Sequence, residues 1–380
     1  MSQQVIKIAV LGCGARSSYV VGNLLKEAGD AVKIVAVYEP DPAVATETLR
    51  KWKAEDAVQC KTYQEAIETE GVQWVMVFSP NAHHKEQVVH AFSCGRHVFS
   101  EKPLATSLED CVAINDAHRR SGCQFATGFV LRYSLLYQKA KEILSSGILG
   151  KIILVEGNEN ITPVHGGYIM CNWRRHSSEA GPHILEKCCH DLDLIEFLVA
   201  SIPEKIMAFG GRNFFIPENG KLLEKYGEKA FMTWPDPHRT ATPFTDDSDM
   251  MDNLVSIAEF KNQVRVSFSY TMSNAIPERR LYFSCSEGNL RLDLYAKKIS
   301  WRNIGDAAEH TLEFTGSDGH GGGDDTIMKE LFDTMVNHTP PRCAGKEGLR
   351  SAVYAMAIDK AATTGAIVNL APVWKELGEE

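Results

Sequence analysis

Two short motifs in this chain could perform chemistry together. Gly12-Cys13-Gly14 lies near the N-terminus, and Glu101-Lys102-Pro103 follows much later. Glycines between a strand and a helix let backbone N–H groups approach a pyrophosphate, whose charge then lies at the helix N-terminus. A lysine beside a carboxylate can hold or transfer a proton. The pair therefore predicts a bound dinucleotide and a proton-handling group near its reactive ring.

A parallel sheet is needed to position these motifs. Residues 6–11 form a β-branched apolar run that ends in glycines, which is typical of a buried parallel strand. Helical stretches are expected at about 17–28 and 83–94. Further strands are expected at 32–38, 74–78, 97–100 and 124–127. Strands that alternate with helices predict a parallel sheet with helices on both faces.

The pattern changes after about residue 128. Residues 151–160 form a long strand candidate, and apolar and polar residues alternate in 264–270 and 290–294. This alternation predicts a sheet with one buried and one wet face. We therefore expect an α/β protein in which an N-terminal Rossmann domain, residues 1–128, precedes an α+β domain with a large, mostly antiparallel open sheet, residues 129–380.

Two parts of the second domain invite more specific expectations. The wet face of its sheet is a natural surface for a homodimer or homotetramer. Residues 213–250 contain four prolines and are interpreted as a loop. A structureless stretch of that length is usually a functional lid or a mobile excursion.

Composition excludes several classes of function. The chain has 380 residues, which suits two domains, and a net charge of -9, which disfavours nucleic-acid binding. No apolar run approaches the roughly 20 residues that span a bilayer. The N-terminus lacks the pattern of a signal peptide, so we expect a cytoplasmic protein. The ten cysteines are scattered without a paired CxxC zinc pattern, so free thiols are expected.

The residues around the glycine turn favour NAD. Glu39 ends the second expected strand, where a carboxylate can accept hydrogen bonds from both ribose hydroxyls and would repel a 2′-phosphate. Arg16 leaves NADP possible, and Ser17 replaces the third glycine of the usual pattern. An ordinary βα turn and an exposed strand-end glutamate are the alternatives. The expected cofactor contacts are Gly12, Gly14, Ala15, Arg16, Glu39, Ser79, Pro80, Asn81, His84, Glu101 and Lys102.

These motifs, taken in order, resemble those of a known family. Ser79-Pro80-Asn81-Ala82-His83-His84 and the stretch from Gly95 to Ala105 follow the glycine turn, and the similarity continues through Arg132-Tyr133-Ser134, Gly181 to Asp193 and Gly319 to Asp324. The chain thus resembles the glucose-fructose oxidoreductase / inositol dehydrogenase / MocA (Gfo/Idh/MocA) family. The resemblance implies a nicotinamide cofactor and oxidation of a secondary alcohol on a sugar or cyclitol.

The same resemblance implies the catalytic residues. Lys102 matches the lysine of the family's EKP motif, and His190 matches the histidine of its D-x-x-x-H-x-x-D helix, which ends here at Asp193. Glu186 stands where an aspartate is more usual. One extra methylene gives its carboxylate a longer reach.

The spacing of these residues suits alcohol oxidation. Glu186, His190 and Asp193 lie at i, i+4 and i+7, so one continuous helix would bring them to one face. Hydride transfer to nicotinamide requires a base for the hydroxyl proton, and histidine suits that exchange near neutral pH. We expect His190 to take the proton, Lys102 to hydrogen-bond the same oxygen and Glu186 to orient one of them. A polar interface cluster or a metal site has the same spacing, but hydride transfer needs no metal and we expect none.

Several residues could contact the substrate. Arginine and an aromatic ring together suit a hydroxylated ligand, through bidentate hydrogen bonding and stacking. A solvated basic patch is the alternative for Arg174 and its neighbour Arg175. His165 is a further substrate candidate, and His320 either approaches the active site or marks a turn before a helix capped by Asp324. The candidates are Arg132, Tyr168, Trp173, Arg174 and Asp193.

Three functions fit these observations. The first is an NAD(P)-dependent dehydrogenase or reductase acting on CH–OH groups of a sugar, sugar derivative or cyclitol. The second is a redox-neutral enzyme that keeps NAD bound, in which transient oxidation permits epimerisation, elimination or glycoside cleavage. The third is a sensor that binds dinucleotide without turnover. The presence of both Lys102 and His190 argues against the sensor.

Overall fold

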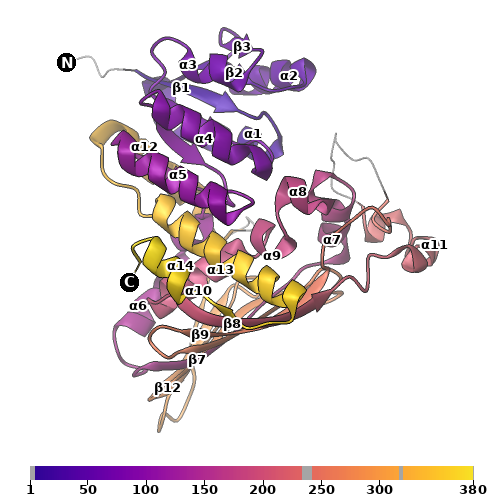
Figure 1. Cartoon of the computed structure of the whole chain (residues 1–380). Coiled ribbons are helices and arrows are strands. Elements are labelled where there is room, and N and C mark those ends of the chain that lie inside the picture. Colours follow the sequence, from indigo (N-terminus) through magenta and orange to yellow (C-terminus); the bar gives the residue numbers. More distant parts are fainter. Residues whose placement is uncertain (1–4, 233–241, 316–319, 380) are drawn as a thin grey trace. The chain divides into compact units, whose positions relative to one another are not determined.

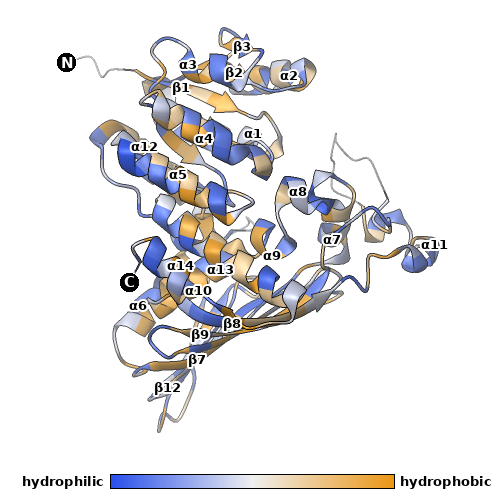
Figure 2. Ribbon diagram, in the orientation of Figure 1, coloured by the Kyte–Doolittle hydropathy of each residue, from blue (hydrophilic) through white to orange (hydrophobic). Residues whose placement is uncertain are grey.

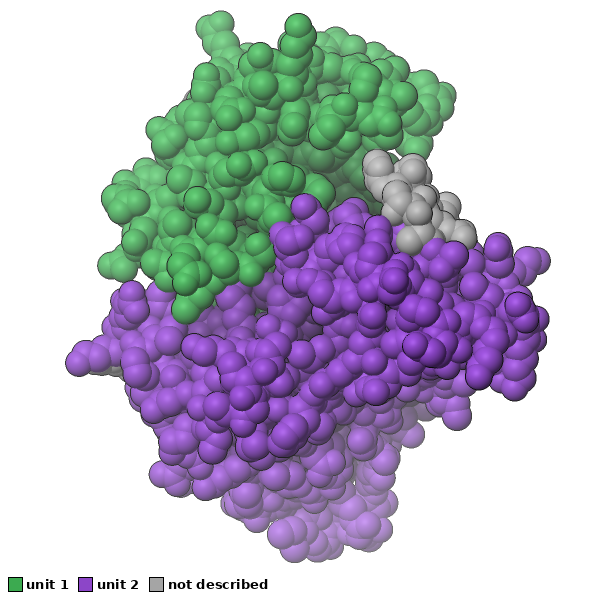
Figure 3. Space-filling model, turned by 45° about the vertical axis from the view of Figure 1, so that its right-hand side comes forward, with its two compact units in different colours: residues 1–133, 322–352 green, residues 134–321, 353–380 purple. Residues whose placement is uncertain are grey.

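The chain folds into two compact units in a computed structural model that describes residues 5–232, 242–315 and 320–379 (Figure 1). Unit 1 comprises Met1–Tyr133 and Gly322–Ala352, and unit 2 comprises Ser134–Gly321 and Val353–Glu380 (Figure 3). The expected domains were contiguous, with a boundary near residue 128. In the structure, the late segment 322–352 is part of the compact unit that contains the N-terminus.

Unit 1 contains a six-stranded parallel sheet in the order β3-β2-β1-β4-β5-β6. Its first strand, β1, has the buried pattern expected of a central strand, and Figure 2 shows it mainly in the orange of hydrophobic residues. The predicted Rossmann sheet is therefore confirmed. The strands are β1 Ile6–Leu11, β2 Val32–Tyr38, β3 Val58–Cys60, β4 Trp74–Val77, β5 His97–Ser100 and β6 Phe125–Thr127.

Capping residues define where several helices of unit 1 begin. The side chains of Asp41, Thr62 and Ser107 accept hydrogen bonds from the first-turn N–H groups of α2, α3 and α5. The helices are α1 Ala15–Ala28, η1 Gly29–Ala31, α2 Pro42–Trp52, α3 Tyr63–Glu68, η2 Asn81–His83, α4 His84–Ser93, α5 Leu108–Ser121, η3 Val130–Tyr133 and α12 Gly323–Asn337. A further helix, α13 Gly345–Thr364, begins in unit 1 and ends in unit 2.

Unit 2 contains a nine-stranded sheet in the order β14-β13-β12-β11-β7-β10-β9-β8-β15. Only the pair β7–β10 is parallel among its pairings in the described residues, so the prediction of a mostly antiparallel sheet is confirmed. The strands are β7 Ile152–Asn160, β8 Pro203–Gly211, β9 Asn253–Phe260, β10 Arg265–Thr271, β11 Glu278–Cys285, β12 Gly288–Asp293, β13 Lys298–Asn303, β14 His310–Glu313 and β15 Val368–Asn369.

The helices of unit 2 are mostly short. They are α6 Leu135–Ser145, α7 Pro163–Met170, η4 Trp173–Arg175, α8 Ser177–Ala180, α9 His183–Glu186, α10 Cys189–Val199, η5 Pro217–Asn219, α11 Lys221–Tyr226, η6 Glu228–Ala230 and α14 Ala371–Glu376.

The two faces of the second sheet differ, as the alternating pattern predicts. Phe268 and Tyr270 of β10 are buried. On β8 and β9, by contrast, Phe209, Val255 and Ile257 are exposed, and Phe209 pairs directly with Val255 across the two strands. An apolar strip therefore lies on the open face.

The interpretation of residues 213–250 as a loop is wrong for part of that segment. It contains η5, α11 and η6, and four aromatic rings pack together with centroids between 4.9 and 6.4 Å apart. These rings give the segment an apolar core that its prolines did not reveal. They belong to Phe214, Phe215, Phe231 and Phe244. Residues 233–241 lie outside the described part of the chain.

Two further expectations concern the whole chain. All ten cysteines are free, as predicted. Across the ranges that the structure describes, no helix combines the length and apolar character needed to cross a bilayer.

Candidate functional site

The predicted cofactor residues of unit 1 follow the carboxyl ends of its strands. Gly12 follows β1, Glu39 follows β2, Ser79 comes just after β4, and Glu101 follows β5. Parallel strands direct these ends to one edge of the sheet. The strand order reverses between β1 and β4, and this reversal is where open α/β sheets bind ligands.

Two glycines shape the turn after β1. Gly12 has φ +88°, and a Cβ there would lie 2.8 Å from backbone atoms of Phe78 and Ser79, so only glycine fits. Gly14 is the N-cap residue of α1 and has no side-chain cap, and no atom lies within 4 Å of the position of its Cβ. The turn therefore leaves open space at a helix N-terminus, which suits an anion.

Glu39 is held against the glycine turn. Its carboxylate accepts hydrogen bonds from the N–H groups of Cys13 at 2.8 Å and Asp41 at 3.2 Å. Burial, together with the Glu39 charge, raises the pKa of the Cys13 thiol to about 12. Glu39 is therefore fixed beside the predicted phosphate turn, where its oxygens can also accept from a ribose.

Arg16 is engaged by two carboxylates. Its Nε lies 2.7 Å from Glu101 Oε1, and its Nη1 lies 2.8 Å from Asp324 Oδ1. Gly128 makes room for Glu101, because a Cβ at that position would lie 2.7 Å from the carboxylate. The positive charge that left NADP possible is thus balanced within unit 1. Asp324, at the start of α12, is a contributor that sequence reasoning treated only as a helix cap.

His84 connects the two loops that carry the remaining cofactor candidates. Its Nδ1 lies 2.8 Å from Pro103 O, and its Nε2 lies 3.0 Å from Ser79 O. The ring is buried, and this burial lowers the pKa of His84 despite the two carbonyl groups. His84 therefore joins the Ser79-Pro80 turn to the EKP motif.

The other candidates in unit 1 lie on the same loops or nearby. Ser79 donates from Oγ to Gln87 Oε1 at 2.8 Å, and Asn81 is buried at the start of η2. Lys102 follows Glu101, whose Oε2 accepts from the Lys102 N–H at 3.2 Å. Arg132 lies in η3.

The predicted face of three catalytic residues in unit 2 is not formed by one helix. Glu186 ends α9, whereas His190 and Asp193 lie on α10, and a turn at Lys187 and Cys188 separates the two helices. The expectation of a continuous i, i+4, i+7 face is therefore wrong. The turn sends neighbouring side chains to different partners: Glu186 contacts Arg174, and the Lys187 ammonium lies 3.0 Å from Glu159 on β7.

Four of the predicted residues in unit 2 do come together, around Arg174. Its Nε donates to Glu186 Oε1 at 3.0 Å, and its Nη1 donates to the Tyr168 hydroxyl at 3.1 Å. Its guanidinium also lies 4.2 Å from the centre of the Trp173 ring. Close approach of α7 to its surroundings positions Tyr168, because a Cβ at Gly166 would lie 2.2 Å from Met272 O.

The structure also reveals a buried ion network that sequence reasoning missed. Arg279 of β11 donates two hydrogen bonds to Asp191 of α10, at 2.8 and 2.7 Å, and lies 3.3 Å from Glu159. Burial alone would raise the pKa of Glu159, but Arg279 and Lys187 hold it below its ordinary value. The network attaches α10, and with it His190, to the sheet. In the sequence, the only indication of this network is that charged residues occur within strands and a helix that are otherwise apolar.

The structure also places His190, His320 and His165. His190 and Asp193 are both buried. The rings of His190 and His320 lie 5.8 Å apart, so His320 belongs to the surroundings of His190. Burial, with a smaller effect of Lys187, lowers the pKa of His165 well below its ordinary value. Gly319, part of the motif that ends at Asp324, lies outside the described residues.

Comparison with known proteins identifies the family. Residues 6–129 match the family model described as oxidoreductase family, NAD-binding Rossmann fold (GFO/IDH/MocA), and residues 137–291 match the GFO/IDH/MocA C-terminal domain. The chain belongs to the Gfo/Idh/MocA family. The predictions of the family, of an oxidoreductase and of an NAD-binding Rossmann domain are therefore confirmed.

Individual relatives of this Gfo/Idh/MocA member differ in their names. The chain is 27% identical over 228 residues to scyllo-inositol 2-dehydrogenase (NAD(+)) of Bacillus subtilis (strain 168), a match covering 59% of this chain and 61% of that protein. It is 27% identical over 206 residues to 2,7-anhydro-N-acetylneuraminate hydratase of Escherichia coli (strain K12), a match covering 54% of this chain and 52% of that protein. These matches span only part of each relative.

The similarity in fold extends further than the similarity in sequence. A levoglucosan dehydrogenase, solved in complex with NADH and levoglucosan, superposes with a TM-score of 0.79 over 97% of this chain and 100% of that one, at 17% identity. At this level of identity, the match supports the fold of both units and says nothing about the substrate.

Proposed function

We propose that this oxidoreductase transfers hydride between NAD and a secondary alcohol of a sugar, sugar derivative or cyclitol. The observation that carries the proposal is the Arg174 cluster, in which a guanidinium is ordered by Glu186, Tyr168 and Trp173. Such a group offers planar hydrogen bonding beside aromatic faces, as recognition of a hydroxylated ring requires. The names of the inositol and levoglucosan dehydrogenases support the same class of substrate.

We propose NAD rather than NADP as the cofactor used in this reaction. Arg16 is neutralised by Glu101 and Asp324, and the Glu39 carboxylate would repel a 2′-phosphate. Gly12, Gly14, Ala15 and the loop from Ser79 to Asn81 provide the backbone that would approach the dinucleotide. When bound, NAD supplies the hydride acceptor.

His190 and Lys102 have the proton-handling roles in this proposal. His190 accepts the hydroxyl proton, and Lys102 donates a hydrogen bond to the same oxygen. The sequence suggested that Glu186 orients one of these two residues; because it accepts a hydrogen bond from Arg174, its proposed role is instead to orient the Arg174 guanidinium toward the substrate ring. Asp193 is proposed as a substrate contact from α10, and Arg132 as one from η3.

The first experiment is an absorbance and mass scan of the purified protein, followed by NAD⁺ reduction against a panel of sugars, sugar acids and inositols. Turnover of free NAD⁺ with one panel member is the expected result and would identify the substrate. With that substrate, His190→Ala should reduce kcat by about a hundredfold to ten-thousandfold, because general-base catalysis contributes that much. Undiminished turnover would contradict the assignment.

Two controls make this experiment specific. His83→Ala removes an exposed histidine paired with Glu86 and should leave kcat unchanged. The double variant Lys102→Ala/His190→Ala tests whether the two residues act on one oxygen. If they do, the double variant loses less activity than the product of the single losses. Multiplicative losses would mean that the two residues act independently.

A redox-neutral reaction is the second candidate, favoured by the relatives named as hydratases. Here NAD would remain bound while transient oxidation acidifies a neighbouring C–H group. The expected signs are NAD retained through purification and substrate consumed without net NADH. Release of NADH in step with substrate consumption would rule this candidate out.

We also propose that the chain forms a homodimer or homotetramer through the open face of the second sheet. The exposed strip of Phe209, Val255 and Ile257 supports this proposal, since such residues are seldom left together in water. Val255→Asp should reduce the molar mass measured by light scattering to that of a monomer. Ile304→Asp, at a position 81% exposed outside the strip, is the matched control and should not change the mass.

A further inference from the structure

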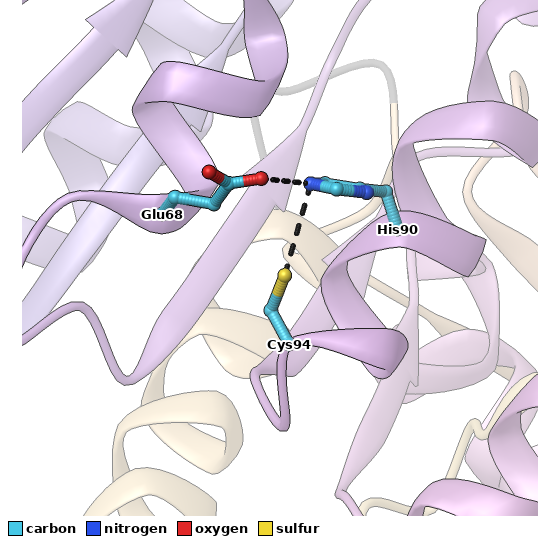
Figure 4. A group of neighbouring side chains, drawn as sticks. All are labelled: Glu68, His90 and Cys94. Atoms are coloured by element: carbon cyan, nitrogen blue, oxygen red, sulfur yellow. Dashed lines mark hydrogen bonds and ion pairs between the residues drawn. The ribbon is translucent and has the colours of Figure 1, made fainter.

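A group of three side chains in unit 1, separate from the residues discussed above, has the composition of a metal site. Glu68 ends α3, His90 lies in the last turn of α4, and Cys94 follows that helix (Figure 4). Among the residues described here, this is the one group of three or more histidine, cysteine or carboxylate side chains arranged closely enough to hold a metal ion.

Local structure holds two of these side chains on one face. His90 and Cys94 are four residues apart, and the Cys94 N–H bonds to His90 O at 3.1 Å, which continues the helical turn. The imidazole is supported from α3, because the Tyr63 ring lies edge-on to it with centroids 6.0 Å apart. Since Glu68 belongs to the same short helix as Tyr63, α3 both orients the imidazole and supplies the carboxylate.

The distances fit one coordinated ion. His90 Nε2 lies 2.8 Å from Glu68 Oε1 and 3.7 Å from Cys94 Sγ, and all three ligand atoms lie within 4.8 Å of one another. In tetrahedral zinc, bonds of about 2.0–2.3 Å place neighbouring ligand atoms roughly 3.3–3.7 Å apart. The nitrogen–sulfur distance already has this value. The carboxylate, 57% exposed, can rotate by the small amount that the nitrogen–oxygen distance requires.

The types of donor atom select the class of ion. Thiolate and imidazole favour zinc and similar transition metals over magnesium or calcium, which prefer oxygen ligands alone. We propose that Glu68, His90 and Cys94 bind one Zn²⁺ ion and leave its fourth position to water. The Cys94 thiol loses its proton to solvent when the Zn–S bond forms, and no electron is transferred. Zn²⁺ would thus fasten α3 to α4.

The test uses the full chain, stripped with a chelator and then dialysed. Co²⁺ is the first probe, since thiolate coordination gives a charge-transfer absorption band in the near ultraviolet. We expect this band to saturate at one Co²⁺ per chain and to disappear when Zn²⁺ is added. Absence of the band in the wild-type protein would overturn the proposal. The absorption band does not depend on catalytic activity, so this test of the metal site is independent of the test of the proposed function.

Variants locate the site. Cys94→Ser, His90→Gln and Glu68→Gln should each weaken Co²⁺ binding by at least about tenfold, because even indirect partners of a metal ligand contribute that much. The side chains of Glu68 and His90 are 57% and 28% exposed, and circular dichroism confirms that each variant is folded. Cys60→Ser and His83→Gln are matched controls that should bind Co²⁺ as the wild type does. A band that survives Cys94→Ser, or disappears in Cys60→Ser, would overturn the assignment.

Discussion

The two units hold their polar groups in different ways. In unit 1, backbone geometry dominates: Gly12 approaches Phe78, Cys13 N–H bonds Glu39, and His84 joins two carbonyl groups. In unit 2, charged side chains from distant segments hold one another, as Arg279 holds Asp191 and Glu159. A backbone-built site requires glycines at particular positions, whereas an ion network requires only that charges meet after folding. The first kind therefore leaves a local signature in the sequence and the second does not.

The largest expected effect tests the ion network of unit 2. Arg279→Ala should lower the free energy of unfolding by about 3–5 kcal/mol, because it leaves two buried carboxylates without their shared cation. Denaturant unfolding measures this loss. Arg265→Ala is the control, because its ion pair with Glu259 is exposed and should contribute less than about 1 kcal/mol. Equal losses of unfolding free energy in both variants would show that the buried network contributes no more to stability than an exposed ion pair.

The next effect tests the backbone geometry of unit 1. Gly12→Ala should lower the free energy of unfolding by at least about 1–2 kcal/mol, since φ is positive, and NAD affinity should fall because the turn must move. Calorimetric titration with NAD⁺ measures the affinity. Gly22→Ala, within α1 and with open space at its Cβ, should be neutral or slightly stabilising. Unchanged NAD⁺ affinity in Gly12→Ala would contradict the assigned role of the turn.

A smaller effect sharpens the comparison through pH. Burial lowers the pKa of His84 below its ordinary value of 6.5, so the unfolded chain binds a proton more readily than the folded one. The resulting stability is present above pH 6.5 and is lost as the pH falls through the folded pKa. As the pH is lowered through this range, the unfolding free energy should decrease more steeply in the wild type than in His84→Gln. Parallel curves would contradict the prediction.

The smallest effect concerns a partly exposed ion pair of unit 2, between Arg175 and Asp247. Hydrogen bonds from Arg175 and Thr245 lower the pKa of Asp247 to about 2. Its contribution is therefore present above pH 3.8, the ordinary value, and is lost as the pH falls toward 2. Asp247→Asn should lower stability by less than about 1 kcal/mol at neutral pH, because the side chain is half exposed. Melting temperatures of the two proteins should converge near pH 2.

Much of unit 1 could be predicted from the sequence because its signals are local. The strands, the Gly12 turn and the acidic residue at the end of β2 each depend on a few neighbouring residues. Arg16 shows the limit, since its second partner, Asp324, lies far along the chain. The parallel order of the strands also explains why separate motifs could be assigned to one edge.

Less of unit 2 could be predicted because its arrangement depends on contacts between distant residues. Counting residues from Glu186 to Asp193 assumed a continuous helix, but the turn at Lys187 interrupts it. The helices within 213–250 depend on packing among aromatic rings, and the spacing of those residues in the sequence does not predict that packing. The composition around Arg174 did indicate a binding cluster, although which residues contact Arg174 was known only from the structure.

The division of unit 1 between Met1–Tyr133 and Gly322–Ala352 has a consequence for synthesis of the protein. A ribosome releases the first segment well before α12, whose Asp324 pairs with Arg16. The nascent Rossmann sheet therefore lacks α12 until most of unit 2 has been synthesised. A fragment that stops at Tyr133 would share that incomplete state permanently, and it would expose the side of α1 that α12 covers in the full chain.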